Sequence, residues 1–359
     1  MKKILFMIAV GTTLLFSNDF FTIDEYSFIH KNEKMKMDLF NQIVQKEPKP
    51  INIKQNDAIK ISIIYPAGEL SDYWRRSEIA FKKRLNLLNI KYEIDFHFID
   101  SNNLLEKNKQ IKKALDNDID YLVFTLNVNI HQKLITQLLS RKKPKVIIQN
   151  MTTPLKQWEG NQAFLYVGFD HIEGSKLLAK YFLDKFKSGA KYGMLYFKQG
   201  YISQMRGDSF IKILNQNKNF ELLDSYYTDG KSSKSFLSTQ KIIQDNKNID
   251  FLYTCSTDVS IGAVNAVKNE SNPPLINGWG GGSKELKMLK DKKLEVTVMR
   301  MNDDSAIAMA EAIKLDLEKK YNLLPQIYSG QFILIDKKTS LKQIERHKAK
   351  AFRYSGYEK

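Results

Sequence analysis

The sequence has very little cysteine. Cys255 is the only cysteine among 359 residues, so no disulfide can form within the chain. A single thiol after the apolar run 251–253 is typical of a small buried residue, and a catalytic thiol would need a histidine that is missing from this stretch. The histidines are too scattered to give the spacing of a metal site: His30, His97, His131, His171 and His347. We therefore expect no metal and no bound cofactor.

Several enzyme motifs are also missing. The chain contains no nucleophile elbow, P-loop, GxGxxG, HExxH or CxxC motif. Residues 278–283 are rich in glycine but lack the lysine that a P-loop requires at that place. The carboxylates of Asp258, Asp303 and Asp304 follow predicted strands, but each also suits the N-terminus of a helix. These absences predict that the protein is not an enzyme.

Long apolar runs are absent after residue 17. Before it, Lys2 and Lys3 precede an apolar run from 4 to 16, and this is the pattern of a secretory signal peptide cleaved near Ser17. The run is too short for a stable membrane span, and no cysteine follows it that could carry a lipid anchor. We expect a signal peptide at 1–17 and export without membrane insertion, to the periplasm of an organism with two membranes.

Acidic residues are outnumbered by basic ones. The formal net charge is +16, mostly from lysine, and such an excess can attract nucleic acid or acidic membranes. The lysines are spread over the polar faces of predicted helices, and an exported protein rarely meets nucleic acid. We therefore expect solvated faces and no nucleic-acid partner, while a contribution to a protein partner surface stays open.

Hydrophobic residues make up 43% of the chain and follow an alternation of strands and helices from residue 58 onward. The segment 18–57 is expected to form an N-terminal helical extension before its prolines. Helices follow most of the strands, one of them at 205–214. This alternation predicts an α/β fold with parallel sheets flanked by helices, and the number of strands favours two Rossmann-like lobes with a ligand cleft between them. The predicted strands are 59–65, 92–99, 121–124, 146–148, 164–167, 192–197, 220–227, 251–253, 274–276, 294–298 and 328–335.

Polar and aromatic side chains follow the carboxyl ends of these strands, where open α/β sheets bind ligands. Trp279 lies among four glycines in 276–283, and Arg300 stands between two methionines, where a solvated arginine is hard to explain. The other candidates in these loops are Glu69, Ser71, Trp74, Asn150, Arg206 and Thr257. Most have a purely structural explanation as well: Ser71 and Thr257 as helix caps, Asn150 as a turn residue, Arg206 as a surface charge and Trp279 as core.

Taken together, two arginines, two tryptophans and several hydroxyl and amide groups fall at the same predicted edge. Arginine has fixed donors and a permanent charge, so two arginines that face one cavity repel each other unless the ligand is negative. Tryptophan faces suit a small ring. The predicted ligand is a compact, oxygen-rich, anionic ring compound.

Several short stretches carry a more specific resemblance: 71–74, 149–154, 165–171, 200–203, 206–208, 255–259, 276–283, 298–304 and 351–355. From about Ile59 to Ser355 the chain resembles the LuxP family of periplasmic autoinducer-2 receptors, within the ribose-binding-like superfamily. The resemblance implies a type I periplasmic binding protein with hinge strands between its lobes. The implied N-terminal lobe spans 58–167 and 302–323, and the C-terminal lobe spans 168–301 and 324–359.

The resemblance also implies a ligand and a partner. The ligand would be autoinducer-2 as a furanosyl borate diester, held by closure about hinges near residues 150–170, 300 and 325. The partner would be the periplasmic domain of a LuxQ-like sensor histidine kinase. In the family pattern Arg206 and Arg300 stabilise the charge of the borate, which needs charge-assisted donors when buried. The other implied ligand contacts are Ser71, Trp74, Asn150, Thr257 and Trp279.

Glu69 departs from the family pattern, which has a glutamine at this position. A carboxylate near an anionic ligand is repulsive unless it is protonated, bonded to an arginine or turned away. We hypothesise that Glu69 has a raised pKa or weakens the preference for the borated form.

Other functions fit the same pattern of strands. A sugar-type solute-binding protein of an ABC transporter or chemoreceptor is the main alternative, although a neutral sugar needs no second buried cation. A transcription repressor with this ligand fold is disfavoured by the signal peptide and by the lack of a helix-turn-helix segment.

Overall fold

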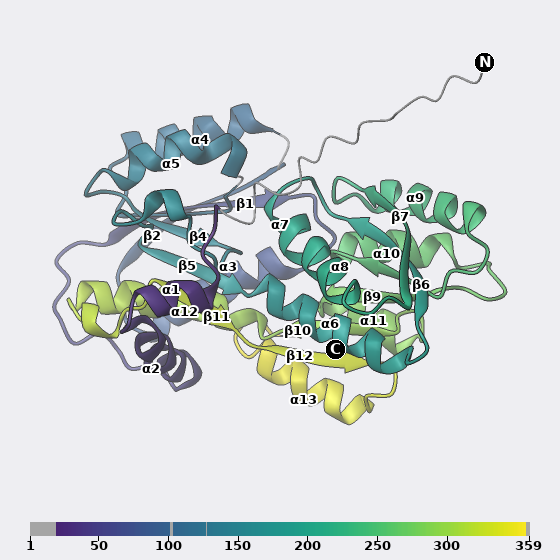
Figure 1. Ribbon diagram of the computed structural model, residues 1–359. Helices are drawn as coiled ribbons and strands as arrows, with labels where there is room; N and C mark the ends of the chain where they lie inside the picture. The colour runs from purple at the N-terminus through teal and green to yellow at the C-terminus, as the bar shows by residue number, and fades with distance from the viewer. Residues whose placement is uncertain (1–18, 101–102, 127, 357–359) are drawn as a thin grey trace, which may run out of the picture.

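The computed structural model describes residues 19–100, 103–126 and 128–356, so the expected signal peptide at 1–17 lies outside the described residues. The chain forms two lobes, each built on a six-stranded sheet with helices on both faces (Figure 1). This arrangement confirms the predicted α/β class with two sheets of mostly parallel strands. Within the described ranges, no helix has the length and apolar character that a membrane span requires.

In the N-terminal lobe all six strands run parallel, in the order β11-β5-β4-β3-β1-β2. Every residue of the central strand Tyr121–Phe124 is buried, because a parallel sheet is covered on both faces. Helices α4 and α5 pack on one face and helices α3 and α12 on the other. The bounds are β1 (Ile59–Ala67), β2 (Tyr92–Asp100), β3 (Tyr121–Phe124), β4 (Lys145–Gln149), β5 (Leu165–Phe169), β11 (Ile327–Gly330), α3 (Tyr73–Leu87), α4 (Leu104–Asp116), α5 (Val128–Leu139), η1 (Lys156–Trp158) and α12 (Asn302–Leu317).

In the C-terminal lobe the order is β12-β10-β9-β8-β6-β7, and only β12 runs antiparallel to its neighbour. Helices α6 and α8 (Ser209–Leu214) pack on one face, and α9, α10 and α11 on the other. The bounds are β6 (Ala190–Tyr196), β7 (Phe220–Tyr227), β8 (Phe251–Thr254), β9 (Leu275–Gly280), β10 (Val296–Arg300), β12 (Phe332–Asp336), α6 (His171–Lys185), α9 (Ser232–Asp245), α10 (Thr257–Ala266), α11 (Ser283–Lys290) and α13 (Leu341–Ala351).

The chain passes between the lobes after β5, between β10 and α12, and between β11 and β12. The predicted boundary after residue 167 therefore falls inside β5, and β11 belongs to the N-terminal lobe, although the predicted boundaries place 324–359 in the C-terminal lobe. The single strand predicted at 328–335 is wrong. Its apolar pattern runs on without a break, but the chain changes sheet at Gln331, whose carbonyl accepts a hydrogen bond from Met301 N–H at 3.0 Å. The third crossing thus lies near residue 331 instead of 325.

The helix predicted at 205–214 begins earlier and is irregular. It consists of α7 (Tyr201–Ser203), a π-helical turn η2 (Gln204–Asp208) and α8 (Ser209–Leu214). Turns of this kind occur often at functional sites, because the extra residue redirects a side chain. Here the turn contains Arg206.

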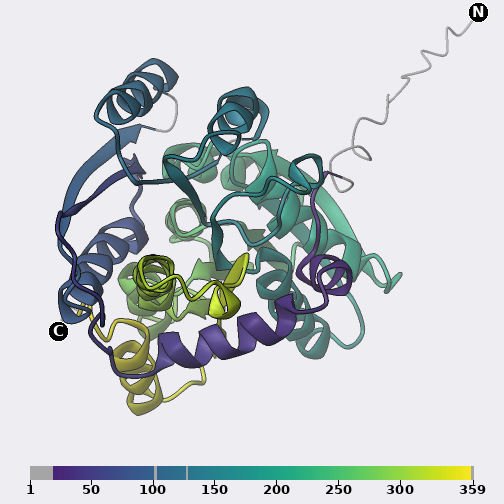
Figure 2. The ribbon, with the colours of Figure 1, turned by 90° about the vertical axis from the view of Figure 1, so that its left-hand side faces the viewer.

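The N-terminal extension consists of α1 (Ile23–Ile29) and α2 (Glu33–Gln45). Helix α2 packs against α12 and β11, on the side of the N-terminal lobe away from α4 and α5 (Figure 2). The buried Glu33 carboxylate accepts hydrogen bonds from the N–H groups of Gln326 and Ile327, at 2.7 and 2.9 Å. The turn η3 (Tyr321–Leu323) lies next to α2. The extension is therefore tied to the start of β11, the strand that leads to the third crossing between the lobes.

Candidate functional site

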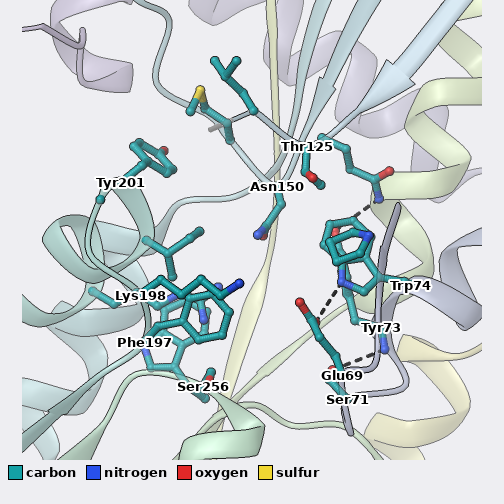
Figure 3. Close-up of a pocket in the computed structure, with 18 of the residues that line it drawn as sticks. Glu69, Ser71, Tyr73, Trp74, Thr125, Asn150, Phe197, Lys198, Tyr201 and Ser256 are labelled. Carbon is teal, nitrogen blue, oxygen red and sulfur yellow. Dashed lines mark hydrogen bonds between the residues drawn. The ribbon is translucent and has the colours of Figure 1, made fainter. Parts of the chain in front are cut away.

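A cavity of about 360 Å³ lies between the two lobes, at the carboxyl ends of their strands (Figure 3). Both lobes and the crossing segments contribute to its wall. All eight of the predicted site residues line it: Glu69, Ser71, Trp74, Asn150, Arg206, Thr257, Trp279 and Arg300. The structure thus brings together residues that are 231 positions apart in the chain, counting from Glu69 to Arg300 (300 minus 69).

The end of β9 and the glycine-rich loop after it are held by Glu285, in the first turn of α11. One Glu285 carboxylate oxygen accepts a hydrogen bond from Trp279 N–H at 3.0 Å. The other oxygen accepts from Gly281 N–H at 2.8 Å and from the Thr297 hydroxyl at 2.5 Å. Glu285 is fully buried, so these bonds are shielded from water. The loop is therefore a fixed part of the wall.

The indole of Trp279 is only 1% exposed. Its Nε1–H donates to the Tyr253 hydroxyl at 3.2 Å. A Cβ added at Gly174 would lie 2.7 Å from the indole, so this glycine makes room for the ring. The Arg206 guanidinium stacks 3.7 Å above the ring centroid. Trp279 is thus both a core residue and the support of a cavity cation.

Arg206 lies in the π-helical turn, and its guanidinium contacts Cys255 and His171 in addition to the ring of Trp279. Its Nη1 donates to the Cys255 carbonyl at 2.8 Å, and its Nε lies 3.4 Å from His171 Nδ1. Burial, followed by the nearby charge of Arg300, lowers the pKa of Arg206 to about 9. The guanidinium therefore stays charged at neutral pH, but a negative partner would stabilise it.

Arg300 lies at the end of β10, with its guanidinium 4.1 Å from the Tyr73 ring centroid. Gly280 has a φ of 129°, and a Cβ there would lie 2.5 Å from Arg300 Nη2. This glycine thus provides the space in which the guanidinium lies. Burial lowers the pKa of Arg300, and its Nε has no hydrogen-bond partner among the described residues.

Glu69 projects into the cavity from the N-terminal lobe (Figure 3). Its carboxylate accepts a hydrogen bond from the Trp74 indole Nε1–H at 2.9 Å. Burial, followed by the negative charge of Asp258, raises the pKa of Glu69 to about 7, although the Trp74 bond and the two cavity arginines oppose this rise. Glu69 therefore changes charge near neutral pH.

Asn150 follows β4 with a φ of 66°, a left-handed conformation that asparagine tolerates better than most residues. Its carbonyl lies 3.1 Å from His171 Nε2, and its side-chain oxygen has no partner among the described residues. Burial, together with the charge of Arg206, lowers the pKa of His171 well below its usual value. A neutral His171 can donate to Asn150 and accept from Arg206, so it fixes both residues.

Two polar contacts join the lobes beside the cavity. The Leu70 N–H in the N-terminal lobe donates to the Asp258 carboxylate in the C-terminal lobe at 2.9 Å. The Ser283 hydroxyl donates to the Asp72 carboxylate at 2.8 Å, and Arg76 Nε also donates to Asp72, at 2.6 Å. The lobes are therefore in contact on both sides of the loop that carries Ser71.

The cavity has an excess of unpaired positive charge. Neither Arg206 nor Arg300 is within 4.0 Å of a carboxylate oxygen in the described part of the chain. Among the described residues, no group of three His, Cys, Asp or Glu side chains could hold a metal ion. The arrangement suits a small ring with oxygen acceptors and negative charge.

Sequence reasoning missed the residues that hold the site in place. Glu285 and His171 each stand in the first turn of a helix, where an acidic or polar residue looks like an ordinary helix-start signal. Lys107 and Lys198 also line the cavity, although they look like ordinary surface lysines in the sequence.

A protein-family model described as the periplasmic binding protein domain matches residues 61–320 of this chain. The chain belongs to the periplasmic binding protein family. Among curated relatives, ribose import binding protein RbsB of Bacillus subtilis (strain 168) is 25% identical over 133 residues, which are 37% of this chain and 43% of that protein. The protein of the same name from Haemophilus influenzae is 24% identical over 37% of this chain and 46% of its own length. The aligned part thus spans less than half of these relatives.

Solved periplasmic binding proteins share the fold. A solute-binding protein from Actinobacillus succinogenes 130z with bound D-allose has a TM-score of 0.65 and 17% identity, over 80% of this chain and 99% of that one. The XylFII–LytSN complex contains a chain with a TM-score of 0.68 and 16% identity, over 79% of this chain and 100% of that one. The relatives are named as binding proteins, which supports the prediction of a non-enzymatic role.

Proposed function

We propose that this periplasmic binding protein is a receptor for a small, oxygen-rich ring compound that binds in the cleft between its lobes with a negative charge. The observation that carries the proposal is the pair of buried arginines, Arg206 and Arg300, which share one cavity without a carboxylate partner within ion-pair distance. Burial of an unpaired charge is costly, so a ligand that supplies the missing negative charge gains affinity from both residues.

Autoinducer-2 as a furanosyl borate diester fits this requirement. The borate carries the charge, the ring matches a cavity flanked by Trp74 and Trp279, and hydroxyl or amide groups of Ser71, Asn150 and Thr257 supply further hydrogen bonds. The ligand would reach the protein in the periplasm, where members of this family are found.

A neutral pentose or hexose delivered to an ABC transporter or chemoreceptor is the second candidate. It is favoured by the relatives, two of which are named for ribose import, and by the D-allose that a structurally similar protein holds. A neutral ligand leaves the two arginine charges unmatched. The comparisons support this candidate, whereas the charge of the cavity supports the first.

Substitution of the arginines separates the two candidates. Arg206→Met and Arg300→Met should each weaken binding of a borate diester by about a hundredfold or more, since a buried charge pair is broken. The same changes should weaken a neutral sugar by only about tenfold, the effect of one lost hydrogen bond. Isothermal titration of autoinducer-2 with and without borate, and of D-ribose, gives both values. Arg346→Met, which changes an exposed arginine, is the matched control, and equal losses for both ligands would contradict the anionic reading.

We also propose that closure of the lobes is read by a membrane partner, for which a LuxQ-like sensor kinase is the specific candidate. A solved complex of XylFII with LytSN supports docking of this fold on a second protein. Pull-down of the receptor with the periplasmic domain of such a kinase, with and without ligand, tests the proposal. Binding that does not change with ligand would contradict it.

A further inference from the structure

The cavity extends beyond the pocket of the two arginines. Its wall continues from Asn150 along Thr125 and Leu126 of the N-terminal lobe, and along residues 197–202 of the C-terminal lobe, which lead into and begin α7. Two lysines lie in this extension, Lys107 on α4 and Lys198 after β6. The proposed ring contacts leave the extension unexplained.

Lys107 is unusual for a lysine on a helix, because its side chain is only 8% exposed. Its ammonium donates to the Thr125 carbonyl at 2.9 Å and lies 5.3 Å from the Phe124 ring centroid. An ammonium has three donors, and the described residues place no carboxylate in ion-pair contact with this one. Burial, together with the charge of Lys198, lowers the pKa of Lys107 to about 8. Among the described residues, the Lys107 ammonium therefore has no ion-pair partner.

Lys198 approaches the extension from the opposite lobe. It is partly buried, and Figure 3 shows its side chain extending into the space between the lobes. Two like charges from opposite lobes repel each other more strongly as the cleft closes and water leaves it. A negative group between them would reverse that effect.

We propose that Lys107 and Lys198 form a second anion subsite in the cleft, which binds a phosphate or carboxylate group when the lobes close. The inference rests on the proposed binding of a ligand in this cleft, and goes beyond it in assigning an anion to the two lysines. The anion is either a substituent of the ring compound or a separate small ion, because the chemistry that the lysines recognise is the same.

Inorganic phosphate tests the subsite without a ring compound. In the full exported chain with isotope-labelled lysine, NMR should show saturable shifts of the Lys107 and Lys198 signals in phosphate, and an increase in the pKa of Lys107. Lys107→Met with Lys198→Met should abolish the binding, Lys107→Arg should retain it, and Lys218→Met, which changes an exposed lysine, should leave it unchanged. Unshifted signals, or equal phosphate binding by the double variant, would overturn the subsite.

Ligand recovered from the exported protein distinguishes the two sources. If the anion is a substituent, the recovered molecule contains the phosphate or carboxylate and binds the double variant about tenfold more weakly. If the anion is separate, added phosphate strengthens binding of the recovered molecule to the native protein only. Independence from the lysines and from phosphate would contradict the inference. A chain that binds phosphate but no ring compound would instead contradict the proposed function.

Discussion

At the scale of single residues, Glu69 decides how the cavity charge depends on pH. Its carboxyl group interacts electrostatically with Arg206, Arg300 and Asp258. Among the described residues, neither arginine has a carboxylate oxygen within 4.0 Å, so the charge of Glu69 changes the balance of charge in the cavity. Its pKa is raised to about 7 from an ordinary value of 4.5, mainly by burial. Neutral Glu69 leaves both arginine charges available, whereas ionised Glu69 repels an anionic ligand.

An anionic ligand should therefore bind more tightly at pH 6 than at pH 8, because protonation of Glu69 on the acid side of about 7 removes the repulsion. Titration calorimetry over this range should show affinity rising as pH falls, together with proton uptake on binding. Glu69→Gln should bind tightly with no such dependence, and Glu173→Gln, an exposed change, should behave like the native protein. A pH profile that Glu69→Gln leaves intact would refute this role.

Glu69 should also make the folded protein more stable at low pH than at high pH. Since its folded pKa is raised, folding favours the protonated form. The stabilising effect is present below 4.5, the ordinary value, and is lost as pH rises through about 7. Urea unfolding at several pH values measures this effect. Between pH 4.5 and about 7, the free energy of unfolding should fall less for Glu69→Gln than for the native chain. An equal loss in both would show that Glu69 is already ionised in the folded protein.

At the scale of elements, the loop after β9 depends on the first turn of α11. Glu285 satisfies the N–H groups of Trp279 and Gly281, both of which are buried. The loop in turn leaves space for the guanidinium of Arg300 beside Gly280. The position of Arg300 in the cavity thus depends on the backbone conformation of this loop, and that conformation depends on the Glu285 carboxylate.

Glu285→Ala should lower the free energy of unfolding by about 3 kcal/mol, because two buried N–H groups lose their acceptor. Denaturant unfolding measures this change. Glu270→Ala, in an exposed position, should change the free energy by less than about 0.5 kcal/mol. A loss for Glu285→Ala as small as that of the control would mean that water or another group satisfies the loop.

Most elements were predictable from the sequence, because buried parallel strands are short apolar runs. The candidate site was predictable because open α/β sheets bind ligands beyond the carboxyl ends of their strands. This is why residues from Glu69 to Arg300 could be assigned to one cavity wall. The break at Gln331 was not predictable, since the apolar pattern continues through it and only the packing of the two lobes separates β11 from β12. Lys107 and His171 were missed because their roles depend on burial and on contacts between elements.

At the scale of the whole molecule, polar contacts join the two lobes beside the cavity. The Asp72 carboxylate, at the N-terminus of α3, accepts hydrogen bonds from Arg76 of the same helix and from Ser283 of the other lobe. Arg76 Nη2 also donates to the Ser283 hydroxyl at 2.9 Å. These contacts lie next to the loops of Ser71 and Trp279, so ligand binding and closure are expected to be coupled.

Ser283→Ala should favour the open form and weaken ligand binding by about tenfold, the effect of one hydrogen bond to a charged group. Small-angle scattering should show a larger radius of gyration than for the native protein at the same ligand concentration. Ser271→Ala, an exposed change, should alter neither quantity. Unchanged affinity and radius in Ser283→Ala would show that this contact does not stabilise the closed form.

The identity of the carried ligand bears most directly on the proposed receptor. The exported protein should be purified without added ligand, and the released molecule analysed by mass spectrometry and boron NMR. We expect a small polyhydroxylated ring compound that is negatively charged when bound, with a tetrahedral borate signal if it is autoinducer-2. Release of only a neutral sugar, without boron, and equally tight binding of that sugar by Arg206→Met would contradict the role assigned to the two arginines.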